Sequence, residues 1–99
     1  MTLCKVVGTV VATRKDEKLT GSKLLVVQEI DLDCNPKDRF YIAVDSVGAG
    51  TGEVVLIATG SSARYTAVTR DKPVDAAIIA IVDIIEVGGQ VKYRKGQSA

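Results

Sequence analysis

Short apolar runs alternate along this chain with turns rich in glycine, proline and charged residues. Four runs predict strands, because they are rich in Val, Ile and Leu, which favour extended backbone. These four runs are Cys4–Thr13, Lys23–Ile30, Arg39–Asp45 and Glu53–Thr59. In the third run Phe40, Ile42 and Val44 alternate with less apolar positions, the period of a half-buried strand. Gly8, inside the first run, predicts a bulge or a barrel bend.

The longest apolar region, Ala76–Val87, follows a helix-like start signal formed by Pro73 and Asp75. Seven of its twelve residues are Ile or Val, whose branched side chains disfavour helix. A helix apolar on nearly every side would also have to be buried all round. We therefore predict one long, central strand. The Gly-Gly pair that follows signals a hairpin, with Gln90–Lys95 returning as a short charged edge strand.

The remaining segments are predicted to be loops. The five consecutive charges of Arg14–Lys18 are typical of a solvated hairpin loop. Asp31–Asp38 gathers turn formers, and its three aspartates lack the spacing of a calcium loop. Tyr65–Lys72 is polar and irregular, with room for one helical turn for which Ser61 or Ser62 is a suitable N-cap.

These elements predict an all-β fold, a small OB-fold-like β-barrel of five to six strands with at most one short helix. Ninety-nine residues suffice for one domain, so 1–99 is expected to be a single unit in which 96–99 is a frayed tail. Hydrophobic residues make up 46% of the chain and aromatic residues 4%, so the core is expected to be aliphatic.

The composition argues against several classes of function. The net charge of +1 and four aromatic residues argue against a nucleic-acid surface. Histidine is absent, and no residue set nominates a reaction, a metal or a cofactor, so we expect a protein that is not an enzyme. Two unpatterned cysteines and the lack of a signal-peptide layout favour the reducing cytosol. No apolar run approaches the roughly 18 residues that span a membrane.

The stretch Asp45–Arg64 contains two turns of small residues around one apolar strand. In the first turn, Gly48, Gly50 and Gly52 resemble a dinucleotide-binding loop. The motif fails in two respects, however: Glu53 stands where the third glycine is required, and a strand follows instead of a helix. Glycines leave room for another group to approach the backbone closely, and the residues alone leave open whether that group is a ligand, a neighbouring strand or a neighbouring subunit.

The second turn consists of Gly60, Ser61, Ser62, Ala63 and Arg64. Its backbone N–H groups, hydroxyls and guanidinium could together form a nest for a phosphate or carboxylate. The reading we favour is a structural turn in which Arg64 pairs with a carboxylate such as Asp45 or Glu53, in the same chain or across a subunit boundary.

Three segments stand in a distinctive order: DSVGAGTGE at 45–53, GSSAR at 60–64 and PVDAA at 73–77. Shorter ones are VGTV at 7–10, LTGSKLL at 19–25 and IVD at 81–83. With these motifs the chain resembles the EutN/CcmL family of bacterial microcompartment vertex proteins over essentially its whole length. The 35–36 Asn-Pro loop and the GGQV ending at 88–91 are more similar to the ethanolamine-type branch than to the carboxysome branch.

The resemblance implies a structural, OB-like barrel protein that forms cyclic homopentamers. Such pentamers close the vertices of polyhedral shells in the bacterial cytoplasm, beside hexameric shell proteins, with no nucleic-acid or membrane partner. A subunit interface or axial opening would then involve Asp45, Gly48, Gly50, Gly52, Glu53, Gly60, Ser61, Ser62, Ala63 and Arg64. The alternative is an OB-fold binding module for an oligonucleotide or another small anionic ligand.

Overall fold

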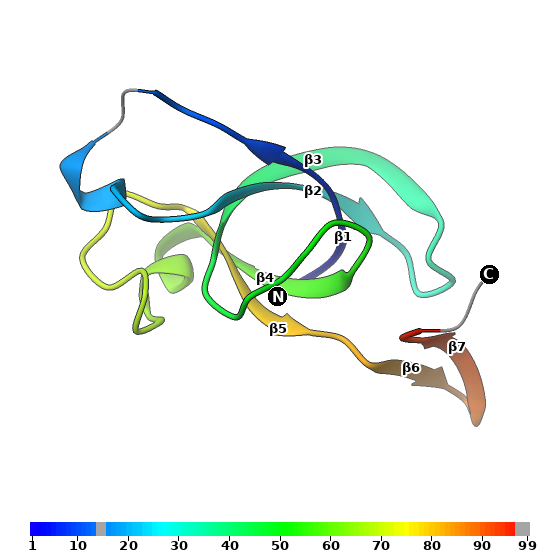
Figure 1. Ribbon diagram of the computed structural model, residues 1–99. Helices are drawn as coiled ribbons and strands as arrows, with labels where there is room; N and C mark the ends of the chain where they lie inside the picture. The colour runs from blue at the N-terminus through cyan, green and yellow to red at the C-terminus, as the bar shows by residue number, and fades with distance from the viewer. Residues whose placement is uncertain (14–15, 97–99) are drawn as a thin grey trace.

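The structure, a computed structural model, describes residues 1–13 and 16–96 (Figure 1). Seven strands and two 3-10 helices follow one another along these residues. They are β1 (Thr2–Val10), η1 (Glu17–Leu19), β2 (Leu24–Ile30), β3 (Pro36–Asp45), β4 (Val54–Thr59), η2 (Gly60–Arg64), β5 (Ala76–Ile81), β6 (Ile84–Val87) and β7 (Gln90–Arg94). Part of the predicted charged loop (14–15) and most of the predicted frayed tail (97–99) lie outside the described residues.

Five strands close into a barrel in the order β1-β2-β3-β5-β4 (Figure 1). Neighbours run antiparallel, except that β3 and β5 pair in parallel. The remaining strands, β6 and β7, form a separate two-stranded sheet. The all-β barrel is therefore confirmed. No helix in 1–13 or 16–96 is long and apolar enough to cross a membrane.

The predicted irregularity in the first strand is confirmed. The register of β1 against β2 shifts between Val6 and Gly8, so one extra residue of β1 is accommodated there. A bulge bends the strand and increases its twist, which helps a small sheet to close.

The barrel interior is aliphatic, as predicted. Its buried cluster consists of Cys4, Val6, Leu25, Val27, Ala43, Ala49, Val55, Ile57, Ala76 and Ile78. Tyr41 is the one aromatic side chain packed against this cluster in the described part of the chain.

Some of the apolar side chains of β3 point toward the solvent. Tyr41 and Ala43 face the core opposite the buried Val27 and Leu25, since residues paired across strands share a face. Phe40 and the neighbouring Ile42 therefore point outward and are 54% and 50% exposed. The alternation of a half-buried strand holds over Phe40–Ala43, where apolar residues occupy the outer face, and it ends at Val44, which is 2% exposed.

The long strand predicted over Ala76–Val87 is wrong, because the structure divides it into β5 and β6. The β5 ladder against β4 ends at Ile81, and the intervening Asp83 is exposed. There the carbonyl of Asp83 accepts a hydrogen bond of 2.8 Å from Lys95 N, which fixes the base of the β6–β7 hairpin. The hairpin itself is confirmed. Because it lies outside the barrel, the barrel has five strands, within the predicted five to six, and the described residues form seven strands in all.

The predicted helical turn occurs earlier than expected. It spans Gly60–Arg64 rather than part of Tyr65–Lys72, so Ser61 and Ser62 lie inside it instead of capping it. The N-cap is Thr59, whose side chain makes no capping hydrogen bond. Tyr65–Lys72 is instead a series of bends and turns. A second 3-10 turn, η1, precedes β2, and the described residues contain no helix beyond these two 3-10 turns.

Candidate functional site

The carboxylate of Asp45 organises the first glycine turn. Its Oδ1 atom accepts three backbone hydrogen bonds, from Val47 and Gly48 at 3.0 Å and from Ala49 at 3.2 Å. Lys23 Nζ lies 3.9 Å from Asp45 Oδ2 and donates to the Ala49 carbonyl at 2.8 Å. The Asp45 side chain is only 5% exposed. This aspartate therefore stabilises its own turn.

Glu53 closes the same turn from the other end. Its Oε1 atom accepts a hydrogen bond of 2.6 Å from Gly50 N, and its Oε2 atom lies 2.8 Å from Lys95 Nζ. The bond from Lys95, followed by that from Gly50, holds the pKa of the Glu53 carboxyl below its usual range. The carboxylate thus joins the glycine turn to the segment that follows the hairpin.

Two of the three glycines in this turn have a backbone reason to be glycine. Gly48 and Gly52 have φ angles of 81° and 91°, where a Cβ atom is strained. Gly50 lies outside that region, and a Cβ added there would meet only Glu53 Oε1, at 3.5 Å. The glycine spacing therefore reflects turn geometry at Gly48 and Gly52 and leaves Gly50 without a local requirement.

The second turn is anchored at its start and its middle. Gly60 N donates to the Asp75 carbonyl at 2.8 Å. The carbonyl of the fully buried Ala63 accepts a hydrogen bond of 2.6 Å from the hydroxyl of Thr69, which is also fully buried. The sequence analysis did not predict that Thr69 is buried, because a hydrophilic residue within a polar segment gives no signal of burial.

Arg64 is exposed and does not pair with the carboxylates considered for it within one chain. Asp45 and Glu53 lie beside Lys23 and Lys95 instead. Among the described residues no carboxylate lies within 4.0 Å of the Arg64 guanidinium. Pairing of Arg64 across a subunit boundary stays a prediction.

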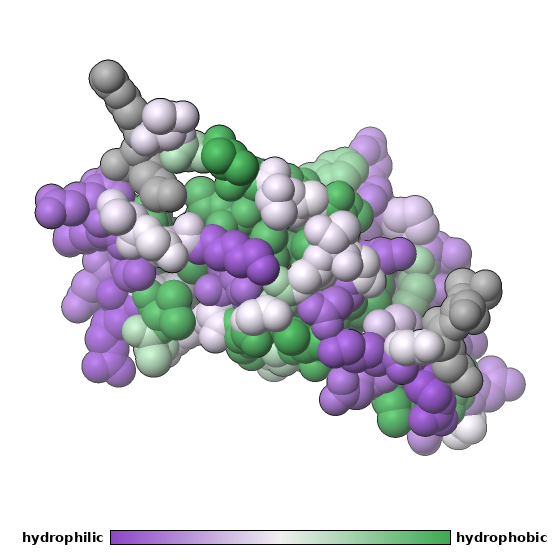
Figure 2. Space-filling view, viewed as in Figure 1, coloured by the Kyte–Doolittle hydropathy of each residue, from purple (hydrophilic) through white to green (hydrophobic). Residues whose placement is uncertain are grey.

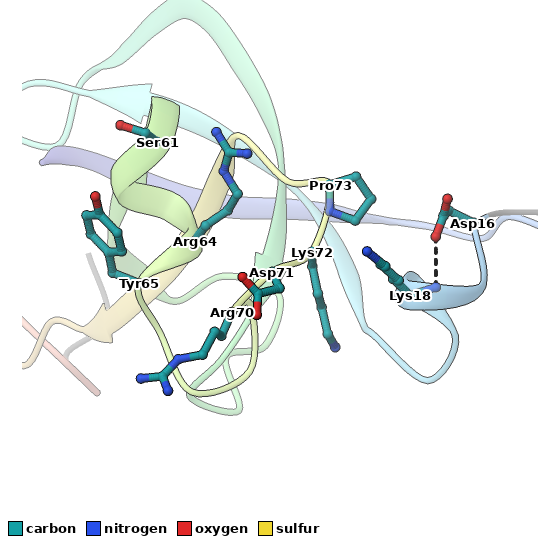
Figure 3. Close-up of a pocket in the computed structure, with 9 residues that line it drawn as sticks. All are labelled: Asp16, Lys18, Ser61, Arg64, Tyr65, Arg70, Asp71, Lys72 and Pro73. Atoms are coloured by element: carbon teal, nitrogen blue, oxygen red, sulfur yellow. Dashed lines mark hydrogen bonds between the residues drawn. The ribbon is translucent and has the colours of Figure 1, made fainter.

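Arg64 instead lines an open hollow of about 980 Å³ (Figure 3). Its lining comes from three segments: η1, η2 and the loop at 70–73. The charged members are Asp16, Lys18, Arg64, Arg70, Asp71 and Lys72. Ser61, Tyr65 and Pro73 complete it. Sequence reasoning singled out Ser61 and Arg64. It did not place Lys18 beside them, because the fold brings the η1 region next to the loop at 70–73, which lies about 50 residues further along the chain.

The two turns are not brought together within one chain. Glu53 precedes β4 and Gly60 follows it, so the strand separates them by about 20 Å at the usual rise per residue. Any single interface that includes both turns must therefore extend along β4 or be built from two subunits.

Reactive and metal-binding chemistry is sparse. In residues 1–13 and 16–96 no three His, Cys, Asp or Glu side chains are grouped to hold a metal ion. Cys4 and Cys34 are free thiols. Burial, and then the nearby Glu29 carboxylate, raise the pKa of the Cys4 thiol to about 11, so it is a poor nucleophile at neutral pH.

The family model described as "Ethanolamine utilisation protein EutN/carboxysome" matches residues 1–83. The chain belongs to the EutN/CcmL family. The family resemblance found in the glycine turns and their neighbours is therefore confirmed.

Individual relatives match over nearly the whole chain. The carboxysome shell vertex protein CcmL of Nostoc sp. is 47% identical over 96% of this chain and 95% of its own length, and its solved structure superimposes with a TM-score of 0.92. The bacterial microcompartment shell vertex protein EutN of Salmonella typhimurium is 44% identical, covering 96% of this chain and 95% of its own.

A third solved relative has a stated assembly. It is the GrpN pentameric microcompartment shell protein from Rhodospirillum rubrum, 46% identical with a TM-score of 0.81, covering 88% of this chain and 99% of its own. Identities to the carboxysome and ethanolamine relatives differ by only a few per cent, so similarity to the ethanolamine branch stays a prediction.

Proposed function

We propose that this protein is a structural vertex protein of a bacterial microcompartment shell and works as a homopentamer. The observation that supports this most strongly is the match to shell vertex proteins along 96% of the chain, together with a relative that is pentameric. Closed shells need fivefold points among flat hexagonal tiles, and a head-to-tail contact closes into a ring when its rotation permits. In this role the protein is located in the shell and has no catalytic site.

The surface of the barrel supports self-association. Phe40 and Ile42 lie exposed on β3, and Ile84, Val87 and Val91 lie exposed on the hairpin. On the face seen in Figure 2, hydrophobic residues gather over the middle of the molecule, with hydrophilic residues toward both ends. Clusters of exposed apolar side chains mark interaction surfaces.

We place the two small-residue turns at the subunit interface or the axial opening. Ser61, Ser62 and Arg64 are exposed on η2, where a neighbouring subunit can reach them. Asp45 and Glu53 contribute indirectly in this proposal, because their carboxylates already hold the first turn. Small side chains suit a place where five copies converge.

Ser62→Trp tests this placement. Ser62 is exposed in one chain, so the barrel should fold unchanged, whereas the ring should be lost if Ser62 lies in a crowded interface. Val11→Trp is the matched control, because Val11 is 92% exposed on a loop. Native mass spectrometry reads the assembly and far-UV circular dichroism reads the fold. A pentamer that tolerates Ser62→Trp as well as the control contradicts the placement.

The partners of the pentamer in this proposal are hexameric shell proteins. Co-expression with one such hexamer, with and without this protein, tests the role. Closed particles that require the vertex protein support it, and closed particles of the same size and integrity in its absence contradict it.

The cationic hollow favours one second candidate, an OB-type module for a small anionic ligand. Lys18, Arg64, Arg70 and Lys72 outnumber the two acidic residues there, and Tyr65 is 80% exposed. Titration with single-stranded DNA at low salt tests it, since such a contact weakens steeply with salt. We expect no salt-sensitive binding; binding that an Arg64→Ala/Arg70→Ala variant loses would favour the binding module instead.

A further inference from the structure

The β6–β7 hairpin is joined to its own barrel through few groups. It shares no ladder with the barrel strands, and none of its side chains belongs to the buried core cluster of residues 1–13 and 16–96. In Figure 1 it projects beyond the barrel at one end of the molecule. A two-stranded sheet without a packed core is only marginally stable in water. The few groups that join it to the barrel therefore decide where the hairpin lies.

A hollow of about 540 Å³ lies between the hairpin and the barrel. Ile30, Cys34 and Val54 line it from the barrel, and Val91 and Tyr93 line it from the hairpin. Side chains packed against each other as in a protein core leave no hollow of this size. The hairpin therefore has room to move relative to the barrel.

Two ion pairs in the described part of the chain link the end of the hairpin to the barrel. Lys92 Nζ lies 3.0 Å from Asp33 Oδ1, and Lys95 Nζ lies 2.8 Å from Glu53 Oε2. The side chains of Asp33 and Lys95 are 59% and 44% exposed, so water and salt compete for both pairs. We refer to these two ion pairs as the clasp. The clasp can open without unpacking the barrel core.

The pair between Glu53 and Lys95 is ordered at both ends. The Glu53 carbonyl accepts a hydrogen bond of 2.9 Å from Val6 N, and Glu53 Oε1 accepts one of 2.6 Å from Gly50 N. Lys95 N donates to the Asp83 carbonyl at 2.8 Å. Because these bonds already order both backbones, the pair loses little further conformational entropy when it forms. Glu53 is therefore the better-fixed acidic member of the clasp.

The chain can bend between β5 and β6. The ladder of β5 against β4 ends at Ile81, and Val82 N donates to the Val54 carbonyl at 2.8 Å. Val82 and Asp83 belong to neither strand, and Asp83 is exposed. These two residues are the hinge on which the hairpin is mounted.

We propose that the β6–β7 hairpin is a hinged arm that the clasp holds against its own barrel, with Glu53 as the positioning residue. When the clasp opens, the arm swings about Val82 and Asp83 and uncovers the hollow. Ionic strength sets the balance between the two positions, because salt screens exposed charges. Every contact in this device lies within one chain, so the inference goes beyond the proposed homopentamer and does not depend on it.

The two native thiols report the position of the arm. Cys34 lines the hollow, whereas Cys4 is fully buried in the core. The protein is treated with N-ethylmaleimide at one fixed pH, and intact-mass spectrometry counts the labels. Lys95→Gln should speed the first label about two- to fivefold, the range that an ion pair of this exposure supports. A second label at the same rate would mean that the barrel unfolds, and would overturn the proposal.

A double-mutant cycle separates the clasp from the glycine turn. Lys95→Gln leaves the bond from Gly50 N to Glu53 intact, and Glu53→Gln removes the charge on the other side of the pair. The two residues act as a unit, so Glu53→Gln/Lys95→Gln should label no faster than the faster single variant. Glu86→Gln is the matched control, because it removes the same charge from the exposed surface of the hairpin and should label at the wild-type rate.

Salt gives an independent readout. Raising the NaCl concentration from about 0.01 M to about 1 M should speed labelling of the wild type more than labelling of the double variant, because the Debye length falls from about 30 Å to about 3 Å. Equal labelling rates in the wild type and both single variants, or equal salt effects in the wild type and the double variant, overturn the proposal. A wild-type monomer would instead contradict the proposed function, so the two failures are distinguishable.

Discussion

Replacing Asp45 with alanine should destabilise the protein through the first glycine turn. The substitution removes an acceptor that three backbone N–H groups share. Gly48 and Val47 are exposed, so their N–H groups can bond to water after the change. Ala49 is fully buried, so its N–H group has no such replacement.

The magnitude follows from that difference. A hydrogen bond to a charged acceptor contributes about 1.5–3 kcal/mol, and an unsatisfied buried donor costs a similar amount. The ion pair with Lys23, at 3.9 Å with the Lys23 side chain 54% exposed, adds little. We therefore expect Asp45→Ala to cost about 2–3 kcal/mol. Asp45→Asn, which keeps an oxygen in place, should cost about 1 kcal/mol or less.

Urea denaturation at one fixed protein concentration measures both variants, because the stability of an oligomer depends on concentration. With a urea slope of about 1–3 kcal/mol/M, Asp45→Ala should lower the midpoint by roughly 1–2 M. A loss below about 0.5 kcal/mol, within the scatter of ordinary surface substitutions, would refute the proposed role of the carboxylate. Equal losses in the two variants would show that charge matters more than the acceptor.

Three further predictions concern the glycine turn and the barrel interior. Gly52→Ala should destabilise by about 1 kcal/mol or more and Gly50→Ala by less, measured by urea midpoints, because only Gly52 has a positive φ. Because the pKa of Glu53 is lowered in the folded state, its ionised carboxylate stabilises the protein above the unfolded-state pKa, and this stabilisation is lost as pH falls through the folded-state pKa. The difference in unfolding free energy between the wild type and Glu53→Gln should therefore shrink on acidification. A difference that stays constant with pH contradicts this. Cys4 should resist a thiol reagent at neutral pH until the protein unfolds; rapid labelling in the folded state contradicts its burial.

Much of the barrel could be predicted from local patterns. Val- and Ile-rich runs separated by turn residues locate β1 to β4 to within a few residues, and Gly8 marks the bulge. These signals work because strand propensity and turn chemistry depend on neighbouring residues.

The break between β5 and β6 depends on contacts that the sequence does not display. Asp83 is the first acidic residue in an otherwise apolar run and was the available signal. Its importance comes from the distant Lys95, whose backbone N–H bonds to the Asp83 carbonyl.

The roles of the candidate-site residues were also beyond sequence reasoning. Asp45 and Glu53 were assigned to an interface or opening, yet their carboxylates bond to amides of their own turn and lie beside Lys23 and Lys95. The outward orientation of Ile42 follows from its pairing register with β2, which alternation alone does not fix.

Native mass spectrometry of the purified protein at micromolar concentration tests the central claim most directly. The account predicts a dominant species of five times the chain mass. A clean monomer under the same conditions would contradict it.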